Sequence, residues 1–238
     1  MNFFLDAFRW IFDGSHYGGV NGIDTRVVEH LVISAEVLAV SALIAIPIGY
    51  LVGHTGRGKT LTVALSGGVR ALPTLGLMII LALVLGIGLE APFIAFVVLA
   101  VPSILAGAYA GFEAIDRSTI DAARAVGMTQ WQTLTKVEVP LGLPLLIGGL
   151  RSASLQVIST VTLADYVGAG GLGHFLFLGL KTNDYPQMLA GSIVVIVLAL
   201  LSEVFFSVIQ HLVVPAGVSA SSTNVVRTRP LRSRSALG

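Results

Sequence analysis

Five long apolar runs separate the polar segments of this 238-residue chain, and they constrain its fold more than any other feature. A helix needs roughly 20 apolar residues to cross the hydrocarbon core of a bilayer, and the runs have about this length or more. Only 11% of the residues are charged, against about 25% in a typical soluble domain. The sequence therefore predicts an all-α polytopic membrane protein with five spans, at residues 27–53, 61–88, 92–112, 141–166 and 188–214.

The two ends of the chain lie outside these runs. Residues 1–24 lack the basic start and small-residue cleavage site of a signal peptide. Leu5, Phe8 and Phe12 recur at helical spacing, which is typical of a short interfacial helix anchored by Trp10. A loosely ordered tail fits this segment equally well. Residues 215–238 are rich in Ser and Arg, and we expect a disordered tail there.

Basic residues are distributed unevenly between the two sides of the predicted membrane. The connection 54–60, the segment 113–138 and the C-terminal tail hold most of them, whereas the opposite connections hold only Arg9, Arg26 and Lys181. Positive charge is retained on the cytoplasmic side of a membrane. We therefore expect the N-terminus outside the cell, and the segment 113–138 and the tail in the cytoplasm.

Two glycine-rich motifs suggest nucleotide binding, but their surroundings do not fit it. Residues 53–60, GHTGRGKT, match the phosphate-binding loop, and residues 168–173, GAGGLG, match the dinucleotide fingerprint. Both motifs need a buried strand before them, and each instead follows an apolar run of membrane length. The better interpretation is two turns, one cytoplasmic and one at the outer surface. A nucleotide-binding enzyme based on GHTGRGKT is the least favoured hypothesis.

No set of residues indicates a catalytic or metal site. The chain has no cysteine, which excludes disulfides and thiolate metal ligands, and its five histidines show no pair at ligand spacing. No Ser/His/Asp set or pair of carboxylates converges in the sequence. We therefore expect no enzyme activity, no cofactor, no metal and no nucleic-acid partner.

A polar, helix-forming stretch, DAARAVGMTQWQTLTKVEVP, separates the third and fourth spans at residues 121–140. Ser118 is predicted to cap a first helix, with Asp121 completing a capping box. Gly127 suits a left-handed helix stop. Thr129 and Gln132 predict a second capping box, and hence a second helix outside the bilayer.

The second helix is expected to break at Pro140 before the next span, because Val139 is restricted by the proline that follows it. An apolar stripe is expected along Ile120, Ala123 and Trp131. Small side chains allow another backbone to come close, so the stretch predicts a docking element for a soluble partner. A structured loop that only links two spans is the alternative.

The spacing of this stretch resembles the EAA coupling loop of type I ABC importer permeases, which reads E-A-A, three residues, Gly, nine residues and Ile-x-Leu-Pro. Here the corresponding residues are DAA at 121–123, Gly127 and VEVP at 137–140. RALPTLGL in the second span and GAGGLG after the fourth also resemble this family. The resemblance covers about residues 25–214, and it implies a five-span transmembrane domain whose coupling loop is 113–140.

The resemblance implies a permease subunit in the bacterial cell membrane that performs no chemistry itself. Its partners would be separate cytoplasmic ATPase subunits, an extracellular substrate-binding protein and a second permease copy, identical or related, within membrane lipid. Coupling to the ATPase would fall to Glu113, Asp121, Ala122, Ala123, Gly127 and Pro140.

Within the family, the osmoprotectant branch matches best, through EHLVIS at 29–34, GHTGRGK at 53–59, VRALPTLGL at 69–77 and DAARAVGM at 121–128. It implies import of glycine betaine, choline, carnitine or a proline-type compound. A permease of the same family for another small solute, such as an amino acid, is an alternative. A stand-alone channel or secondary transporter is another.

Polar residues in the spans are candidates for the transport path. Arg70 is expected to pair with Glu36 or Glu203, because a lone charge in a span is costly. The fourth span is too polar to face lipid all round, so its polar stripe faces either the path or neighbouring helices through hydrogen bonds worth roughly 0.6 kcal/mol each. The candidate path or gate residues are Arg70, Pro73, Ser152, Gln156, Ser159, Thr160, Thr162, Asp165, Gly170 and Gly171.

Overall fold

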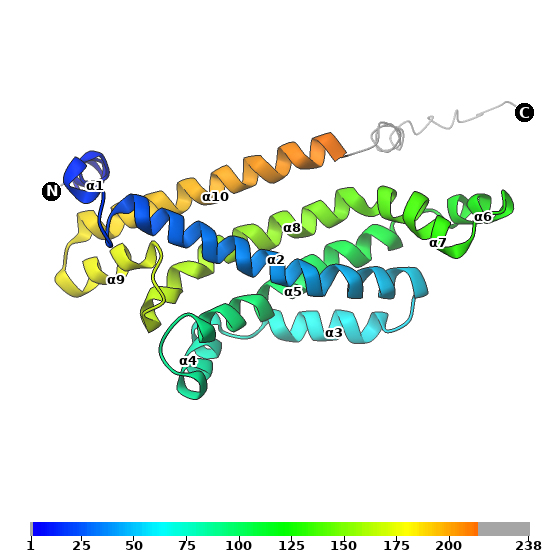
Figure 1. Ribbon diagram of the computed structural model, residues 1–238, viewed down its shortest axis with the longest axis horizontal. Helices are drawn as coiled ribbons and strands as arrows, with labels where there is room; N and C mark the ends of the chain where they lie inside the picture. Colours follow the sequence, from blue (N-terminus) through cyan, green and yellow to red (C-terminus); the bar gives the residue numbers. More distant parts are fainter. Residues whose placement is uncertain (1, 214–238) are drawn as a thin grey trace, which may run out of the picture.

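The computed structural model describes residues 2–213, which form helices and no strand, in agreement with the predicted all-α class (Figure 1). The predicted disordered tail lies outside these residues. The elements are α1 (Phe3–Phe12), a 3-10 turn (Gly14–His16), α2 (Ile23–Thr55), α3 (Lys59–Arg70), α4 (Thr74–Leu85), α5 (Glu90–Glu113), α6 (Arg117–Ala125), α7 (Gln130–Thr133), a π-turn (Leu134–Glu138), α8 (Val139–Val161), a second 3-10 turn (Thr162–Val167), α9 (Gly173–Thr182) and α10 (Tyr185–Val213).

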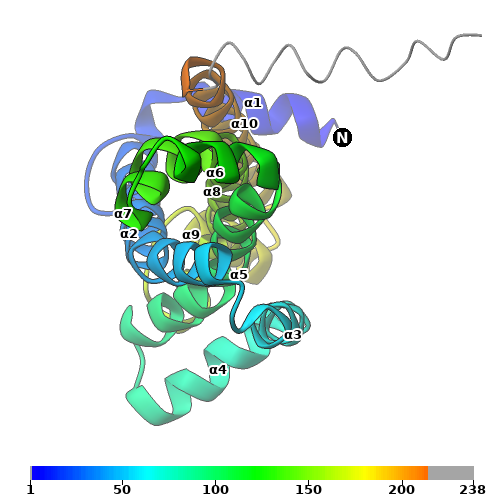
Figure 2. The same ribbon diagram turned by 90° about the vertical axis from the view of Figure 1, so that its right-hand side faces the viewer.

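Four helical segments of the described chain are long and apolar enough to cross a membrane: α2, α5, the segment Gln130–Val167 and α10. They run side by side along the long axis of the molecule (Figures 1 and 2). Apolar side chains of the first three meet in a common core, with Val37, Phe96 and Val157 almost fully buried. The fourth, α10, packs on one flank and buries only Ala190 and Gly191.

The predicted second span is not one straight helix. Helices α3 and α4 have 12 residues each and are bent by 87°. At 1.5 Å per residue each is about 18 Å long, which is shorter than a bilayer core of about 30 Å. Pro73 precedes α4, where its fixed φ fits and its missing N–H leaves no helical bond unmade. Figure 2 shows α4 lying across the bundle axis, and the count of five spans holds only if this bent pair is one span.

The predicted break at Pro140 is also wrong, because the helix continues from Gln130 to Val167. The π-turn at Leu134–Glu138 directly precedes α8, and Pro140 is in the first turn of α8. A proline in a regular helix clashes with the carbonyl four residues earlier, here that of Lys136. The wider π-turn moves this carbonyl aside, so the chain passes the proline without a break.

Glycines bring α5 and α8 into backbone contact. A Cβ added to Gly107 would lie 2.7 Å from the Cα of Gly149, and one added to Gly111 would lie 2.6 Å from the carbonyl oxygen of Gly142. Any larger residue at these positions would separate the two helices. We call this contact the glycine seam.

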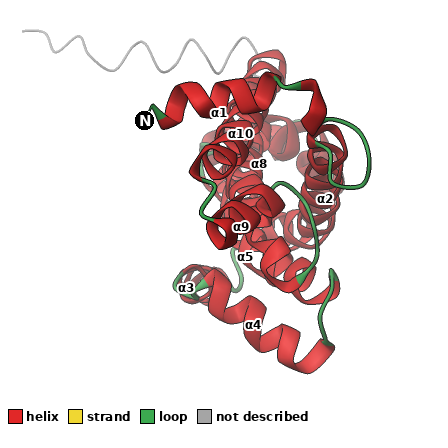
Figure 3. Ribbon diagram, turned by 90° about the vertical axis from the view of Figure 1, so that its left-hand side faces the viewer, coloured by secondary structure: helices red, strands yellow, loops and turns green. Residues whose placement is uncertain are grey.

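The N-terminal segment forms an interfacial-type helix, as one of the two expectations held. Helix α1 lies across the end of α10 (Figure 3). Trp10 packs inward, with its ring centroid 5.2 Å from that of Phe175. The exposed face of α1 is instead formed by Phe4, Phe8 and Phe12. These rings, and not Trp10, are in position to contact lipid.

Candidate functional site

Loop 113–140 forms one end of the bundle, opposite α1 and α9 (Figure 1). Helix α6 begins at Arg117, and the side chain of Asp116 accepts a hydrogen bond from the Ser118 N–H at 3.0 Å. The predicted cap at Ser118 is therefore wrong, and Asp121 completes no capping box. Asp116 takes the role because its backbone is extended, as a helix cap requires.

The predicted left-handed stop at Gly127 is confirmed, with φ of +86°. Its N–H donates to the Arg124 carbonyl at 2.9 Å, and the Met128 N–H donates to the Ala123 carbonyl at 3.2 Å. These two bonds form a Schellman motif, which satisfies carbonyls at the helix end. A Cβ at Gly127 would meet no atom within 4 Å. The backbone conformation, and not internal packing, therefore requires glycine here.

The second capping box is confirmed as well. The Gln132 N–H donates to Thr129 Oγ1 at 3.3 Å, and the Thr129 N–H donates to Gln132 Oε1 at 2.9 Å. Two orphan donors at the start of α7 are thereby satisfied. Loop 113–140 is thus two capped helices around a fixed turn.

The apolar residues of the loop face two directions, which corrects the single stripe expected from the sequence. Ala123 faces inward and is only 8% exposed, and Ile120 lines a cavity beneath α6. Trp131 points outward and is 70% exposed, and Val126, just before the turn, is 76% exposed. Large apolar side chains presented outward beside the turn at Gly127 form a small contact surface, which we call the tip surface.

A polar cavity of about 590 Å³ lies between α6 and the ends of α2 and α5. A hydrogen-bonded pair and an ion pair border it. His54 Nδ1 lies 2.5 Å from Glu138 Oε2, and Lys59 Nζ contacts Glu113 Oε1. The Lys59 ammonium also lies 5.5 Å from the centroid of the Tyr109 ring. The GHTGRGKT motif thus contributes the end of α2, a turn and the start of α3, with paired side chains, and within residues 2–213 no strand precedes it as a phosphate-binding loop needs.

The predicted coupling residues occupy different surroundings within this end of the molecule. Some line the cavity, some are exposed and some are partly or wholly covered. Glu113 and Asp121 line the cavity, Ala122 and Gly127 are exposed, Ala123 is buried, and Pro140 is half-buried in the first turn of α8.

The polar stripe predicted for the fourth span is divided between two roles. Gln156 bridges α8 to α5, because its Nε2 donates to the Leu99 carbonyl at 3.1 Å and its Oε1 accepts from Ser103 Oγ at 3.2 Å. Ser152 and Ser159 lie on an exposed face of α8. Only that exposed face is free to line a path. Thr160 Oγ1 donates within its own helix, to the Gln156 carbonyl at 2.9 Å.

Arg70 does not form the ion pair expected for it. It is exposed at the end of α3, and within residues 2–213 it makes no salt bridge with Glu36 or Glu203. Glu203 instead pairs with Arg151, whose Nη1 also lies 3.5 Å from Gln210 Oε1. Helix α10 packs on α8, whereas the bend after α3 turns away from both, and this separates Arg70 from Glu203 (Figure 2).

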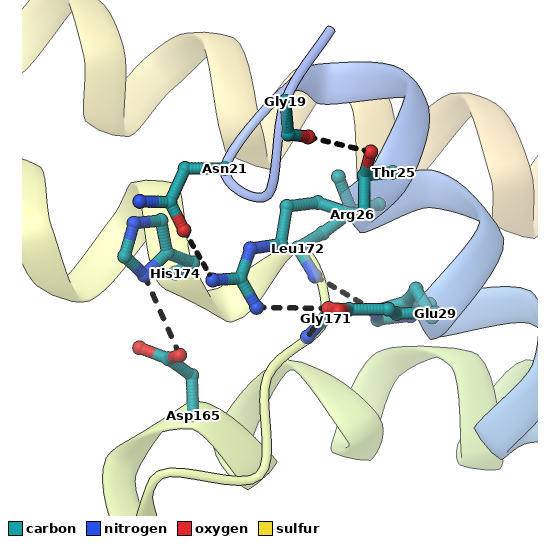
Figure 4. A network of polar contacts seen from close by, with 10 residues as sticks. Gly19, Asn21, Thr25, Arg26, Glu29, Asp165, Gly171, Leu172 and His174 are labelled. Carbon is teal, nitrogen blue, oxygen red and sulfur yellow. Dashed lines mark hydrogen bonds and ion pairs between the residues drawn. The ribbon is translucent and has the colours of Figure 1, made fainter.

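At the opposite end, the glycine-rich turn 168–173 is bound to the start of α2 (Figure 4). Gly171 donates its N–H to Glu29 Oε2 at 3.1 Å, and Glu29 accepts from Arg26 Nη1 at 2.8 Å. A Cβ at Gly170 would lie 2.9 Å from that guanidinium nitrogen. The turn therefore packs against charged side chains, and its glycines allow this approach.

His30 completes this contact from within the bundle. The Leu172 N–H lies 3.3 Å from His30 Nδ1, and His30 Nε2 lies 2.9 Å from the Ile158 carbonyl oxygen. Because Nδ1 accepts, the proton of the neutral ring resides on Nε2, which donates to Ile158. One buried ring thus joins α2, α8 and the glycine-rich turn 168–173.

Two of the remaining predicted path residues, Asp165 and Thr162, lie near this turn. Asp165 is 3.6 Å from His174 Nδ1, as Figure 4 shows. The hydroxyl of Thr162 is buried and has no hydrogen-bond partner among the described residues. Pro73 stands apart from them, at the bend between α3 and α4.

Sequence reasoning missed the roles of His54, Lys59 and His30. His54 and Glu138 are 84 residues apart in the chain, and His30 and Leu172 are 142 apart. Local patterns of helix, cap and turn carry no signal for such pairs. Only the high cost of a buried carboxylate without a partner would have indicated that Glu138 needs one.

Comparison with known proteins identifies the family. Residues 45–216 match the model of the binding-protein-dependent transport system inner membrane component. The carnitine transport permease protein OpuCB of Listeria monocytogenes is 30% identical over 190 residues, covering 80% of this chain and 87% of the relative. The osmoprotectant import permease protein OsmW of Salmonella typhimurium is 28% identical over 222 residues, covering 90% of this chain and all of the relative.

A solved structure shares the fold. An inward-facing form of the MetNI methionine ABC transporter superposes with a TM-score of 0.68 and 23% sequence identity, covering 79% of this chain and 94% of that one. Its helices therefore support the architecture of the bundle. The family model spans well over half of the sequence, and the chain belongs to the binding-protein-dependent transport system inner membrane components, the membrane permeases of ABC importers.

Proposed function

We propose that this chain forms the translocation path of an ATP-driven importer and docks a separate ATPase subunit through loop 113–140. The transmembrane domain would be residues 25–214. The charge distribution supports a cytoplasmic location for loop 113–140 and an extracellular N-terminus. Substrate would be delivered from outside by a separate binding protein, and the chain itself would hydrolyse no ATP.

The observation that carries this proposal is the tip surface. Val126 and Trp131 are exposed on either side of a turn fixed by the Schellman motif and the second capping box. Tryptophan is enriched among residues that dominate binding energy at protein interfaces. A stand-alone channel has no need of such a built surface, and secondary transporters are typically built from internal repeats.

We propose an osmoprotectant as substrate, because the similar proteins are described as permeases for carnitine, for glycine betaine/carnitine/choline and for osmoprotectants. These compounds include quaternary ammonium cations, which offer no hydrogen-bond donors. Another small solute, such as an amino acid, is the alternative within the same family.

The path would run along the exposed face of α8, covered by a second permease copy. Ser152 and Ser159 lie on that face, and the bend between α3 and α4 adds Arg70 and Pro73. The other residues proposed for the path or its gates are Gln156, Thr160, Thr162, Asp165, Gly170 and Gly171.

Substitution of Gly127 by Leu tests the docking surface. The left-handed conformation costs roughly 1–2 kcal/mol for a residue with a side chain, and a bulky group at the tip keeps a partner backbone away. In the complex with its ATPase and binding protein, Gly127→Leu should lose ATPase co-purification and ATP-dependent uptake of radiolabelled glycine betaine.

Gly14→Leu is the matched control, because Gly14 has open space around it and no positive φ. Normal ATPase retention and normal uptake in Gly127→Leu would refute docking through this loop. Uptake by the wild-type complex without ATP would instead favour a channel.

A further inference from the structure

Two basic residues flank one short turn and meet both ends of loop 113–140. We infer that His54 and Lys59 are positioning residues that pass movement of this loop to α2 and α3, an inference that rests on the proposed docking of an ATPase at the loop. We call the hydrogen-bonded pair His54–Glu138 and the ion pair Lys59–Glu113 together the tie.

The tie has one pair of side chains at each end of loop 113–140. Glu113 is the last residue of α5, where the chain enters loop 113–140, and Glu138 is the last residue of the π-turn, where the chain leaves it. His54 is in the last turn of α2, and Lys59 begins α3. Each end of loop 113–140 is therefore joined by a pair of polar side chains to one side of the same turn.

The turn between α2 and α3 is short enough to reach both ends of loop 113–140. Gly56 and Gly58 have φ of +67° and +80°, which reverse the chain within a few residues. A longer turn would not hold His54 and Lys59 against the same end of the bundle. The glycines and the lysine that make GHTGRGKT look like a phosphate-binding loop thus have a structural use in this turn.

The two pairs of the tie differ in their burial and in what they stabilise. Glu138 is 4% exposed, and a buried carboxylate is strongly destabilising unless it is paired. Helix α3 has no buried residue, so its first turn lacks a packed apolar anchor. The pair of Lys59 with Glu113, next to the Tyr109 ring, is a direct polar link from that turn to α5.

Movement passed to α3 reaches the middle of the bundle. Helix α3 ends at Arg70 and continues through Pro73 into α4, which is bent by 87° from it. A shift of α3 along its axis therefore changes the position of α4 across the bundle. The tie thereby connects the docking end to the bend that carries two of the proposed path residues.

Charge reversal tests the exposed pair in the full complex of permease, ATPase and binding protein. Lys59→Glu places two carboxylates together, and uptake of radiolabelled glycine betaine should fall at least about fivefold, the lower end of typical coupling effects. The ATPase should remain bound to this variant and hydrolyse ATP. Lys59→Arg keeps a positive charge opposite Glu113 and should keep uptake at the wild-type level.

Arg57→Glu is the matched control, since it makes the same charge change in the same turn at an exposed residue that has no ion pair among residues 2–213. Its uptake should equal that of the wild type. The buried pair is tested by H54L/E138L, which removes the link without leaving a lone buried charge. This variant should also keep its ATPase and lose uptake.

Equal uptake in Lys59→Glu and Arg57→Glu would overturn the inference, as would loss of uptake in Lys59→Arg. Normal uptake in H54L/E138L would show that the buried pair only stabilises the fold. Failure of the proposed function has a different signature, in which the wild-type permease retains no ATPase, or Gly127→Leu retains it and transports normally.

Discussion

The ion pair between Arg151 and Glu203 links α8 to α10 within the apolar part of the bundle. Substitution of Glu203 by Leu leaves the guanidinium without its carboxylate, and an unpaired arginine in a membrane helix costs on the order of 3 kcal/mol on insertion scales. Partial exposure of both side chains lowers this figure. We expect a lower midpoint of thermal unfolding for the detergent-purified permease.

The double variant R151M/E203L should recover most of this loss, because apolar residues of similar volume replace an ion pair at little cost. Ser152→Ala, on the exposed face of α8, serves as a control with a change near zero. If the single and double variants unfold at the same temperature, the pair contributes nothing to the packing of α10.

At the scale of single elements, the cap of α6 gives a direct test. Asp116→Ala removes the bond to the Ser118 N–H, and loss of such a cap costs about 1 kcal/mol. A helix of nine residues is marginal by itself. Hydrogen exchange of the amides in 117–125 should therefore accelerate roughly fivefold in the permease without its ATPase.

Ser118→Ala is the control for this prediction, and it should leave the exchange unchanged. The opposite pattern, with protection lost in Ser118→Ala and kept in Asp116→Ala, would restore the cap expected from the sequence. The two candidates lie two residues apart, and only the extended backbone at Asp116 distinguishes them.

Elements were predictable from the sequence to the extent that local interactions decide them. Run length and hydropathy identify the four long spanning segments, and cap and turn chemistry identify Gly127 and the Thr129 box. Proline was a poor guide, because Pro47, Pro102 and Pro144 lie inside helices, whereas Pro73 begins a new one. The surrounding packing decides between these outcomes, and an apolar run of constant hydropathy does not report it.

The candidate site was predictable in part, for the same reason. The two helices and the turn of loop 113–140 follow from local sequence, but the polar pairs beneath them join residues far apart in the chain. Arg70 shows where prediction from sequence stops. The free-energy cost of a charge in a membrane span predicts that Arg70 needs a partner, but it does not identify which residue that partner is. The 87° bend exposes Arg70 instead.

The orientation of the whole molecule in the membrane is open to a simple test. The chain has no cysteine, so one introduced cysteine reports its own location. Val20→Cys, before α2, should react with a membrane-impermeant maleimide in intact cells. Arg57→Cys, in the turn between α2 and α3, should react only after permeabilisation.

Both positions are exposed in the structure, so burial does not account for a lack of reaction. Labelling of the two residues from the same side would contradict the arrangement in which the bundle separates α1 and α9 from loop 113–140. Reversed labelling would keep that arrangement and place the loop outside the cell.

The glycine seam has a consequence for how the whole molecule deforms. The two ends of loop 113–140 are attached to α5 and α8. At Gly107 and Gly111 the backbones of these two helices touch with no side chain between them. Backbone contact leaves no compressible layer, so a push on the loop cannot move the two helices closer together at the seam. A sideways push on one helix toward the other is therefore passed on directly, and the tie joins both helices to α2 and α3.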